Sequence, residues 1–227
     1  MSDAKISVSK KAIGHIEKKL TKDMVLGIGT GSTVNFFISE LAKYKGHFYG
    51  AVSSSEASTK LLQEIGIEVF SLNDVNEVAY YIDGADEVDK DLNLIKGGGG
   101  AHTREKMLAD ASKYFICIVD ETKIVQQLGS FGIPIEIMSF GFENTINKLK
   151  TFGTKIEVRD QRSETGNVII DLKGVIIEEP NKLESEIKKV TGVIEVGIFA
   201  KNKPNLLIVG NDKTYKPIDS SIASTIV

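Results

Sequence analysis

The sequence contains one cysteine, no long apolar run and no block of basic residues, and each absence excludes a class of protein. With Cys117 alone, no internal disulfide framework can form. No apolar run approaches the roughly 18 residues of a membrane-spanning helix, and residues 1–20 contain no apolar signal core. The formal net charge of -3 argues against nucleic acid as the main partner. We therefore expect a cytoplasmic protein with no membrane or nucleic-acid partner.

The apolar content is high enough for a buried core. Hydrophobic residues make up 41% of the 227 residues, which excludes a disordered chain and suits one large domain or a medium and a small one. Cys117 lies within the apolar run "YFICIVD", so we interpret it as a core residue rather than a reactive thiol.

The first part of the chain alternates short apolar strands with helical patterns, which is typical of a parallel sheet covered by helices. Strands are predicted at 24–29, 48–53, 78–83 and 114–120, and helices at 33–44, 56–66 and 101–112. This order predicts an α/β fold, a Rossmann-like parallel sheet with helices on both faces. Such sheets bind ligands beyond the carboxyl ends of their strands, and the loops 27–32, 83–89 and 120–123 lie at such ends.

The pattern changes after about residue 131. Strands at 133–139, 155–160, 167–172 and 193–200 and helices at 142–152 and 181–190 follow in the order βαββαβ, a ferredoxin-like α+β arrangement. The last apolar segment, 205–210, is expected to return to the main sheet. We therefore predict a Rossmann-like catalytic domain at 1–130 and 205–227, and a small βαββαβ domain at 131–204.

The loop "GIGTGST" follows a predicted strand and opens a helix. Glycines allow a tight turn, and free N–H groups at a helix start can bind an anion. The dinucleotide fingerprint fails because Ser32 replaces its third glycine, and the P-loop pattern fails because no lysine precedes Ser32. Either a tight turn with no ligand or a site for a small phosphate ester remains open.

The acidic loop "DGADEVDKD" contains five carboxylates. Asp83 and Asp86 lie at the end of a strand, whereas Glu87, Asp89 and Asp91, with Lys90, are interpreted as a solvated loop. The spacing does not match a calcium loop, and a magnesium site at Asp83 and Asp86 has no specific pattern.

The stretch "IKGGGGAHTREK" places four glycines between an apolar run and a helix. A flexible linker would normally have polar flanks, so we interpret this loop as a backbone cradle with Lys96 at its mouth. Glu105 lies near the start of the helix, where it is either a partner of the helix dipole or a general base. His102 is interpreted as structural or incidental.

Together these loops resemble the ribose-5-phosphate isomerase family of A type. The matching stretches, in the family's order, are "GIGTGST", "VSSSEAST", "DGADEVD", "KGGGGAHTREK" and "VDETK". The βαββαβ segment also fits, so the resemblance extends over nearly the whole chain. His102 departs from the family pattern, where we expect an apolar residue.

The resemblance implies interconversion of ribose 5-phosphate and ribulose 5-phosphate in the pentose phosphate pathway, without a cofactor or metal. It implies Glu105 as the general base, with Asp83, Asp86 and Lys96 as the other catalytic residues. The implied substrate-binding residues are Thr30, Gly31, Ser32, Thr33, Asp83, Gly84, Ala85, Asp86, Lys96, Gly97, Gly98, Gly99 and Lys123. Lys10 or Lys11 is a further candidate for gripping the phosphate. A homo-oligomer, either a dimer or a tetramer, is expected.

Two other hypotheses remain. The first is a nucleotide- or acyl-CoA-using enzyme in which Glu105 is a covalent nucleophile, which ping-pong kinetics would indicate. The second is a non-catalytic sugar-phosphate sensor, which should carry a partner element such as a helix-turn-helix; we find no such pattern in the sequence.

Overall fold

The computed structural model describes residues 2–210 and 215–219, and the chain divides into two compact units. The first unit comprises Met1–Gly84, Met107–Lys123 and Pro204–Val227; the second comprises Ala85–Lys106 and Ile124–Lys203. These limits describe how the folded chain is grouped. The division into a Rossmann-like catalytic domain at 1–130 with 205–227 and a small domain at 131–204 stays a prediction.

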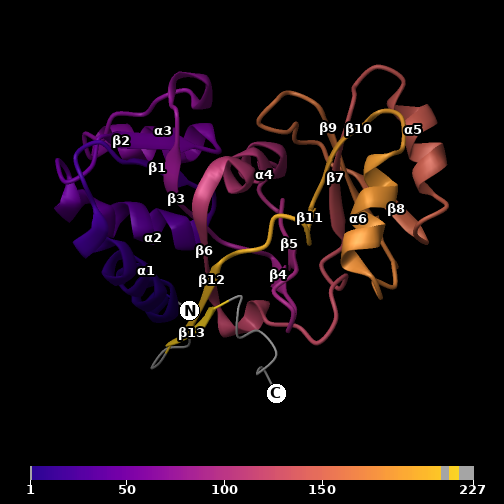
Figure 1. Ribbon diagram of the computed structural model, residues 1–227. Helices are drawn as coiled ribbons and strands as arrows, with labels where there is room; N and C mark the ends of the chain where they lie inside the picture. The colour runs from indigo at the N-terminus through magenta and orange to yellow at the C-terminus, as the bar shows by residue number, and fades with distance from the viewer. Residues whose placement is uncertain (1, 211–214, 220–227) are drawn as a thin grey trace. The chain divides into compact units, whose positions relative to one another are not determined.

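The first unit is built on a six-stranded sheet in the order β13-β12-β6-β3-β1-β2 (Figure 1). All neighbouring strands are parallel except β12 and β13, which are antiparallel. The strands are β1 (Val25–Ile28), β2 (Gly50–Ser53), β3 (Val78–Asp83), β6 (Ser112–Asp120), β12 (Leu206–Gly210) and β13 (Tyr215–Asp219). The predicted Rossmann-like sheet is confirmed, and the segment 205–210 does return to it as β12.

Helices flank this sheet, and in α2 (Ser32–Leu41) the apolar residues recur at helical spacing. The α-helices are α1 (Ser2–Ile16), α2 (Ser32–Leu41), α3 (Glu56–Glu64) and α4 (His102–Ala111); the 3-10 turns are η1 (Glu17–Lys19), η2 (Ala42–Tyr44), η3 (Leu72–Asp74) and η4 (Glu121–Lys123). Helix α4 begins in the second unit and continues into the first from Met107. In α2, the buried residues Val34, Phe37, Ile38 and Leu41 form one face. They pack in the same core as α1 and the sheet residues Ile28, Ile82 and Ile118. Cys117 is fully buried in β6, as predicted.

The second unit contains the predicted order βαββαβ. Its elements are β7 (Ile133–Ile137), α5 (Phe142–Leu149), β8 (Lys155–Val158), β9 (Val168–Lys173), α6 (Pro180–Lys188) and β10 (Val193–Val196). The strands form an antiparallel sheet in the order β10-β7-β9-β8, and Ile146, Leu149 and Ile187 of the two helices share one core with it. This is the ferredoxin-like arrangement that the sequence predicts.

A small three-stranded sheet completes the second unit. It has the order β11-β5-β4, from β4 (Glu87–Val88), β5 (Leu94–Ile95) and β11 (Ile198–Phe199).

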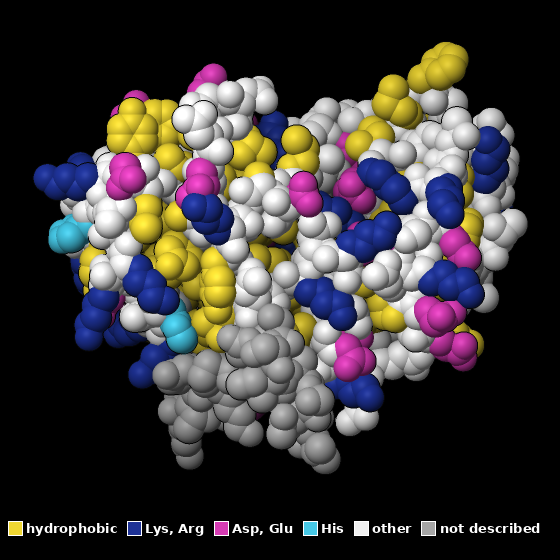
Figure 2. Space-filling view, in the orientation of Figure 1, with side chains coloured by type: hydrophobic (Ala, Val, Ile, Leu, Met, Phe, Trp, Pro, Cys, Tyr) yellow, Lys and Arg dark blue, Asp and Glu magenta, His cyan; other side chains and the backbone are white. Residues whose placement is uncertain are grey.

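None of the helices among residues 2–210 is both long and apolar enough to cross a membrane. On the face shown in Figure 2, basic and acidic side chains are interspersed.

Candidate active site

Three of the predicted site loops lie at one edge of the parallel sheet in the first unit. They follow β1, β3 and β6, which are direct neighbours in the sheet, and parallel strands end at the same edge. The ends of β3 and β6 lie side by side there: a Cβ atom on Gly84 would lie 3.7 Å from the carbonyl oxygen of Ile118, an ordinary van der Waals distance. The topology therefore brings together Thr30, Asp83 and the turn that contains Lys123.

Asp83 is fully buried at the end of β3 and organises the neighbouring loop. Its Oδ1 accepts hydrogen bonds from the N–H of Thr30 (3.0 Å) and of Gly84 (2.7 Å), and its Oδ2 accepts one from the Tyr81 hydroxyl. Three donors compensate the burial of a carboxylate. A Cβ atom on Gly29 would lie 2.0 Å from the Asp83 carboxyl, so only glycine allows this approach.

The loop after β1 is fastened by hydroxyl groups. Thr30 Oγ1 lies 2.7 Å from Ser54 Oγ, and the Ser58 hydroxyl donates to the Gly29 carbonyl at 2.6 Å. Gly31 has φ of 115°, a conformation that favours glycine, and α2 begins at the next residue. Ser32, which is exposed, therefore stands at the start of a ten-residue helix, where N–H groups can receive an anion.

A lysine that the sequence prediction missed contacts this loop from helix α1. Lys5 in α1 donates from Nζ to Ser32 Oγ at 2.8 Å, whereas the sequence pointed to Lys10 or Lys11 in the same helix. Lys10 and Lys11 are exposed. Lys123 is half-buried in η4, in a turn that the Asp120 carboxylate holds by accepting a hydrogen bond from the N–H of Thr122 at 3.0 Å.

The glycine-rich stretch in the second unit is a closed turn. The N–H of Gly100 donates to the Gly97 carbonyl at 3.0 Å, and both residues have positive φ, 106° at Gly97 and 79° at Gly100. The N–H of Gly98 donates to Asp86 Oδ2 at 2.8 Å. A Cβ atom on Gly98 would lie 2.7 Å from Asp86 Oδ1. The stretch is therefore an ordered turn with specific partners, and Asp86 and the four glycines are brought together.

Lys96 and Glu105 form a buried ion pair beside this turn. Lys96 Nζ lies 3.1 Å from Glu105 Oε2, and the two residues are 2% and 3% exposed. Water is excluded from such a pair, so its charges act more strongly than they would at a surface. Lys96 Nζ also lies 5.5 Å from the centre of the Phe199 ring, a distance that allows a cation–π attraction.

The start of α4, which carries Glu105, is held within the second unit by charged groups. Lys106 Nζ donates to Glu184 Oε1 (2.8 Å), Glu195 Oε1 (3.1 Å) and the carbonyls of Val196 (2.6 Å) and Ile198 (2.7 Å). Glu136 is fully buried and accepts hydrogen bonds from side chains that include Thr103 at the start of α4 and Ser163, Thr165 and Asn167. The start of α4 is therefore fixed on both sides of Glu105.

His102 lies at the start of α4 and is completely buried. Burial lowers its pKa from 6.5 to about 4; the Glu136 carboxylate opposes this shift and the Lys106 charge adds to it. The ring packs against the glycine turn, since a Cβ atom on Gly97 would lie 2.8 Å from His102 Nδ1. At neutral pH His102 is therefore uncharged and packs against the glycine turn, which is consistent with the interpretation that it is structural.

The prediction of a solvated acidic loop is wrong for two of its carboxylates. Glu87 and Asp89 are 3% and 8% exposed. Glu87 accepts hydrogen bonds from the N–H groups of Gly129 and Phe131, both at 2.6 Å, and Asp89 accepts from the backbone of Asp91 and Asn93. These donors replace water around the charges. Lys90 and Asp91 are exposed as predicted.

The predicted residues therefore form two groups, one in each unit. In the first unit these are Thr30, Gly31, Ser32, Thr33, Asp83, Gly84 and Lys123; in the second they are Ala85, Asp86, Lys96, Gly97, Gly98, Gly99 and Glu105. Tyr81 and Lys5 join the first group without a sequence signal, although the alternation of side chains along β3 places Tyr81 on the same face as Asp83. No set of three His, Cys, Asp or Glu side chains within residues 2–210 could hold a metal ion.

A family model and several solved structures match this chain, and they agree with one another. The family described as ribose 5-phosphate isomerase A (phosphoriboisomerase A) matches residues 50–214. The chain is 42% identical to ribose 5-phosphate isomerase A from Neisseria gonorrhoeae, with 96% of each chain covered and a TM-score of 0.88. It is 34% identical to the Methanocaldococcus jannaschii enzyme over 96% of this chain and 99% of that one, with a TM-score of 0.86.

A third related structure contains a ligand. It is described as D-ribose-5-phosphate isomerase in complex with phospho-erythronic acid, and it is 36% identical over 96% of this chain and 98% of that one, with a TM-score of 0.86. The family match covers more than half of the chain, and each of these structures covers nearly all of it. The chain belongs to the ribose 5-phosphate isomerase A family.

Proposed function

We propose that this isomerase interconverts D-ribose 5-phosphate and D-ribulose 5-phosphate through a cis-enediol(ate), with Glu105 as the general base. The observation that carries the proposal is the buried Lys96–Glu105 pair, 3.1 Å apart, beside an ordered glycine turn. Aldose–ketose isomerisation needs one base that removes a proton from one carbon and returns it to the next. It also needs positive charge or N–H donors for the oxygen that becomes negative.

The second unit supplies both needs in this proposal. The Glu105 carboxylate transfers the proton between C2 and C1, and the Lys96 ammonium stabilises the enediolate oxygen. The N–H of Gly99 in the glycine turn adds a hydrogen bond to the same charge, since the N–H groups of Gly98 and Gly100 donate to Asp86 and to the Gly97 carbonyl. The site is dry at Lys96 and Glu105, which favours electrostatic stabilisation because the groups need no reorganisation during the reaction. A single carboxylate can serve as the base for such a proton transfer, as a glutamate does in triosephosphate isomerase.

Asp83 and Asp86 are proposed to assist ring opening and to bind the sugar hydroxyls. Thr30, Gly31, Ser32, Thr33, Gly84, Ala85, Gly97, Gly98, Gly99 and Lys123 are proposed as further substrate-binding residues. The start of α2 and Lys5 suit an anion such as the phosphate group. A relative described as binding phospho-erythronic acid, a phosphorylated sugar acid, supports a ligand of this chemical class.

Further proposals follow from membership of the family. The reaction proceeds without a cofactor, the enzyme acts in the non-oxidative branch of the pentose phosphate pathway in the cytoplasm, and the chain forms a homodimer or homotetramer. Its partner in the reaction is the sugar phosphate alone, with no role for a membrane or a nucleic acid.

The test is turnover of ribose 5-phosphate with excess chelator and no added cofactor, in deuterated water. We expect fast conversion by the wild type with solvent deuterium in the product. Glu105→Gln should lower kcat by roughly 10²–10⁴-fold, the usual size for the loss of a general base. Glu186→Gln, at an exposed position in α6, is the matched control and should leave kcat unchanged.

Each outcome has a clear reading. Near-normal turnover by Glu105→Gln removes Glu105 from the role of base. Conversion with no solvent deuterium, together with full activity of Glu105→Gln, points to direct hydride transfer instead of an enediolate. A wild type that does not convert the substrate contradicts the proposed reaction as a whole.

A further inference from the structure

The hairpin formed by β8 and β9 holds the glycine turn, although it follows that turn by about sixty residues and belongs to none of the sequence motifs. Arg159, directly after β8, donates from Nη1 to the Gly97 carbonyl at 2.8 Å and to the Gly98 carbonyl at 3.1 Å. The N–H of Glu164, in the loop of the hairpin, donates to the Gly100 carbonyl at 3.1 Å. The carbonyl side of the turn is thus occupied by the hairpin.

Arg159 is itself held in one orientation. Its Nε and Nη2 donate to the two oxygens of Asp171 at 2.7 and 2.6 Å, which is a bidentate pair. Glu157 pairs directly with Asp171 across the two strands, and Arg159 lies two residues further on. Arg159 and Asp171 are therefore diagonal neighbours on one face of the hairpin. The planar guanidinium uses one edge for Asp171 and leaves Nη1 for the turn, a division that an ammonium cannot reproduce.

This arrangement fixes the direction of the peptide groups. In the Gly97–Gly98 peptide, the carbonyl is bound by Arg159 and the N–H is bound by Asp86, so the group is held at both ends. All described peptide bonds are trans. A trans peptide points its N–H away from its carbonyl, so binding of the Gly98 carbonyl turns the N–H of the exposed Gly99 toward the opposite side of the turn.

We propose that Arg159, oriented by Asp171, is a positioning residue for the isomerisation: by binding the Gly98 carbonyl it aims the N–H of Gly99 at the oxygen that becomes negative. A positive charge on a peptide carbonyl also polarises that peptide and strengthens its N–H as a donor. This inference rests on the proposed function, because it assigns a task to the turn within that reaction. It predicts an effect on the transition state more than on ground-state binding, and so on kcat more than on KM.

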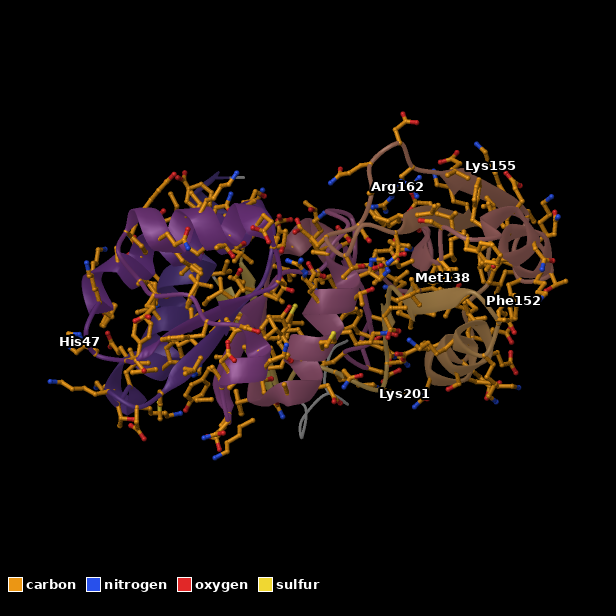
Figure 3. All side chains as sticks on the ribbon, turned by 90° about the horizontal axis from the view of Figure 1, so that it is seen from above. His47, Met138, Phe152, Lys155, Arg162 and Lys201 are labelled. Carbon is orange, nitrogen blue, oxygen red and sulfur yellow. The ribbon has the colours of Figure 1, made fainter. Side chains whose placement is uncertain are left out.

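The experiment compares steady-state kinetics of the wild type with Arg159→Ala, Arg159→Lys and Asp171→Asn. We expect Arg159→Ala to lower kcat by about 10–100-fold, the cost of a small misplacement near the reacting atoms, with KM changed much less. Arg159→Lys and Asp171→Asn should fall between the wild type and Arg159→Ala. The matched control is Arg162→Ala in the same hairpin: its side chain is exposed (Figure 3) and donates to Ser139.

Chemical rescue separates positioning from a loss of folding. Millimolar guanidinium should restore part of the kcat of Arg159→Ala, whereas sodium chloride of equal ionic strength should not, and neither salt should raise the activity of Arg162→Ala. If Arg159→Ala does not fold, Arg159→Lys and Asp171→Asn carry the same comparison of kcat against KM. Circular dichroism and thermal unfolding of each variant establish that it is folded at the assay temperature.

A folded Arg159→Ala with wild-type kcat overturns the inference. So does a loss of kcat that guanidinium does not restore and that parallels the loss of thermal stability across the variants. The failure of the proposed function is recognised separately, because it appears as an inactive wild type or a fully active Glu105→Gln. If the wild type is active, Glu105→Gln has lost activity and Arg159→Ala keeps the wild-type kcat, only the role of Arg159 is removed.

Discussion

The two glycine-containing turns of the molecule are supported in different ways. The turn at 27–33 is bound by groups of neighbouring strands and loops, mainly Asp83 and the hydroxyls of Ser54 and Ser58. Helix α2, which follows it, is held by a wholly apolar inner face. The turn at 97–100 is bound by Arg159 and Asp86, and the start of the following helix α4 is held by Lys106 and Glu136.

The difference lies in energy and in specificity. Apolar burial contributes roughly 25 cal/mol per Å² whatever the detailed geometry, so it stabilises α2 and tolerates small displacements. Buried charges are costly to desolvate and stabilise only when several partners lie at the right distances. Such groups fix the position of Glu105 closely, as the proposed role of that carboxylate requires. The comparison thus predicts that the second unit is more sensitive to the loss of a single charge.

The largest effect is expected for Lys106→Met. Lys106 is 7% exposed and donates to two carboxylates and two carbonyls. Removing one partner of a buried ionic group leaves the others uncompensated, which costs about 3–5 kcal/mol. We expect this loss in the free energy of unfolding, measured by urea denaturation at neutral pH.

Lys188→Met is the control for this change because it removes an ammonium from the same carboxylate at the surface. Lys188 Nζ lies 2.7 Å from Glu195 Oε2, and its side chain is 45% exposed. An exposed pair is worth about 0–1 kcal/mol. Equal stabilities of the two variants would contradict the view that buried charges fasten the start of α4.

The contrast between the turns also explains which residues the sequence could reveal. The main sheet and the predicted loops follow from local runs of apolar residues and from glycines at strand ends. Arg159 holds a turn about sixty residues away, and no local pattern marks that pairing. Glu87 was wrongly predicted to be solvated for the same reason, since the N–H groups that donate hydrogen bonds to it belong to Gly129 and Phe131 in a distant segment. Local order is thus predictable, whereas long-range polar partners depend on the tertiary fold.

A smaller effect is expected from adding a methyl group to each turn. In Gly29→Ala, the Cβ atom meets the buried Asp83 carboxyl at 2.0 Å, and three donors keep that group in place. Overpacking of this kind costs about 1–3 kcal/mol. In Gly98→Ala, the Cβ atom meets Asp86 Oδ1 at 2.7 Å, but Asp86 is only half-buried and can move. We expect lower stability for Gly29→Ala and a lower kcat with nearly unchanged stability for Gly98→Ala.

Gly14→Ala is the control for both changes. Gly14 is exposed within α1, and no atom lies within 4 Å of its added Cβ. The substitution should therefore stabilise the helix by about 0.5–1 kcal/mol. Thermal and urea unfolding check the three variants together. A Gly98→Ala protein that loses as much stability as Gly29→Ala would show that the two turns are equally rigid.

The smallest effect on stability at neutral pH is expected for His102→Leu. This variant tests how the charged surroundings of the turn at 97–100 respond to a fall in pH. The pKa of His102 is about 4 in the folded protein and 6.5 for the ordinary side chain, so the ring is neutral in both states well above pH 6.5. As the pH falls from 6.5 toward 4, the unfolded chain binds a proton that the folded protein does not. The free energy of unfolding of the wild type should therefore decline over that interval, and the leucine variant should lack this part of the decline.

Carboxylates account for what remains at lower pH. Burial alone would raise the pKa of Glu136, but hydrogen bonds from Thr103 and its other partners lower it below 4.5; Lys106 does the same for Glu195 against the effect of burial. Their contribution is present above pH 4.5 and is lost as the pH falls below it. His47→Leu, at an exposed position labelled in Figure 3, is the control and should keep the decline of the wild type. If the free energy of unfolding declines equally for His102→Leu and the wild type between pH 6.5 and 4, another group controls the acid sensitivity. The charged surroundings of the turn at 97–100 would then respond to His102 no more than the apolar surroundings of the turn at 27–33 do.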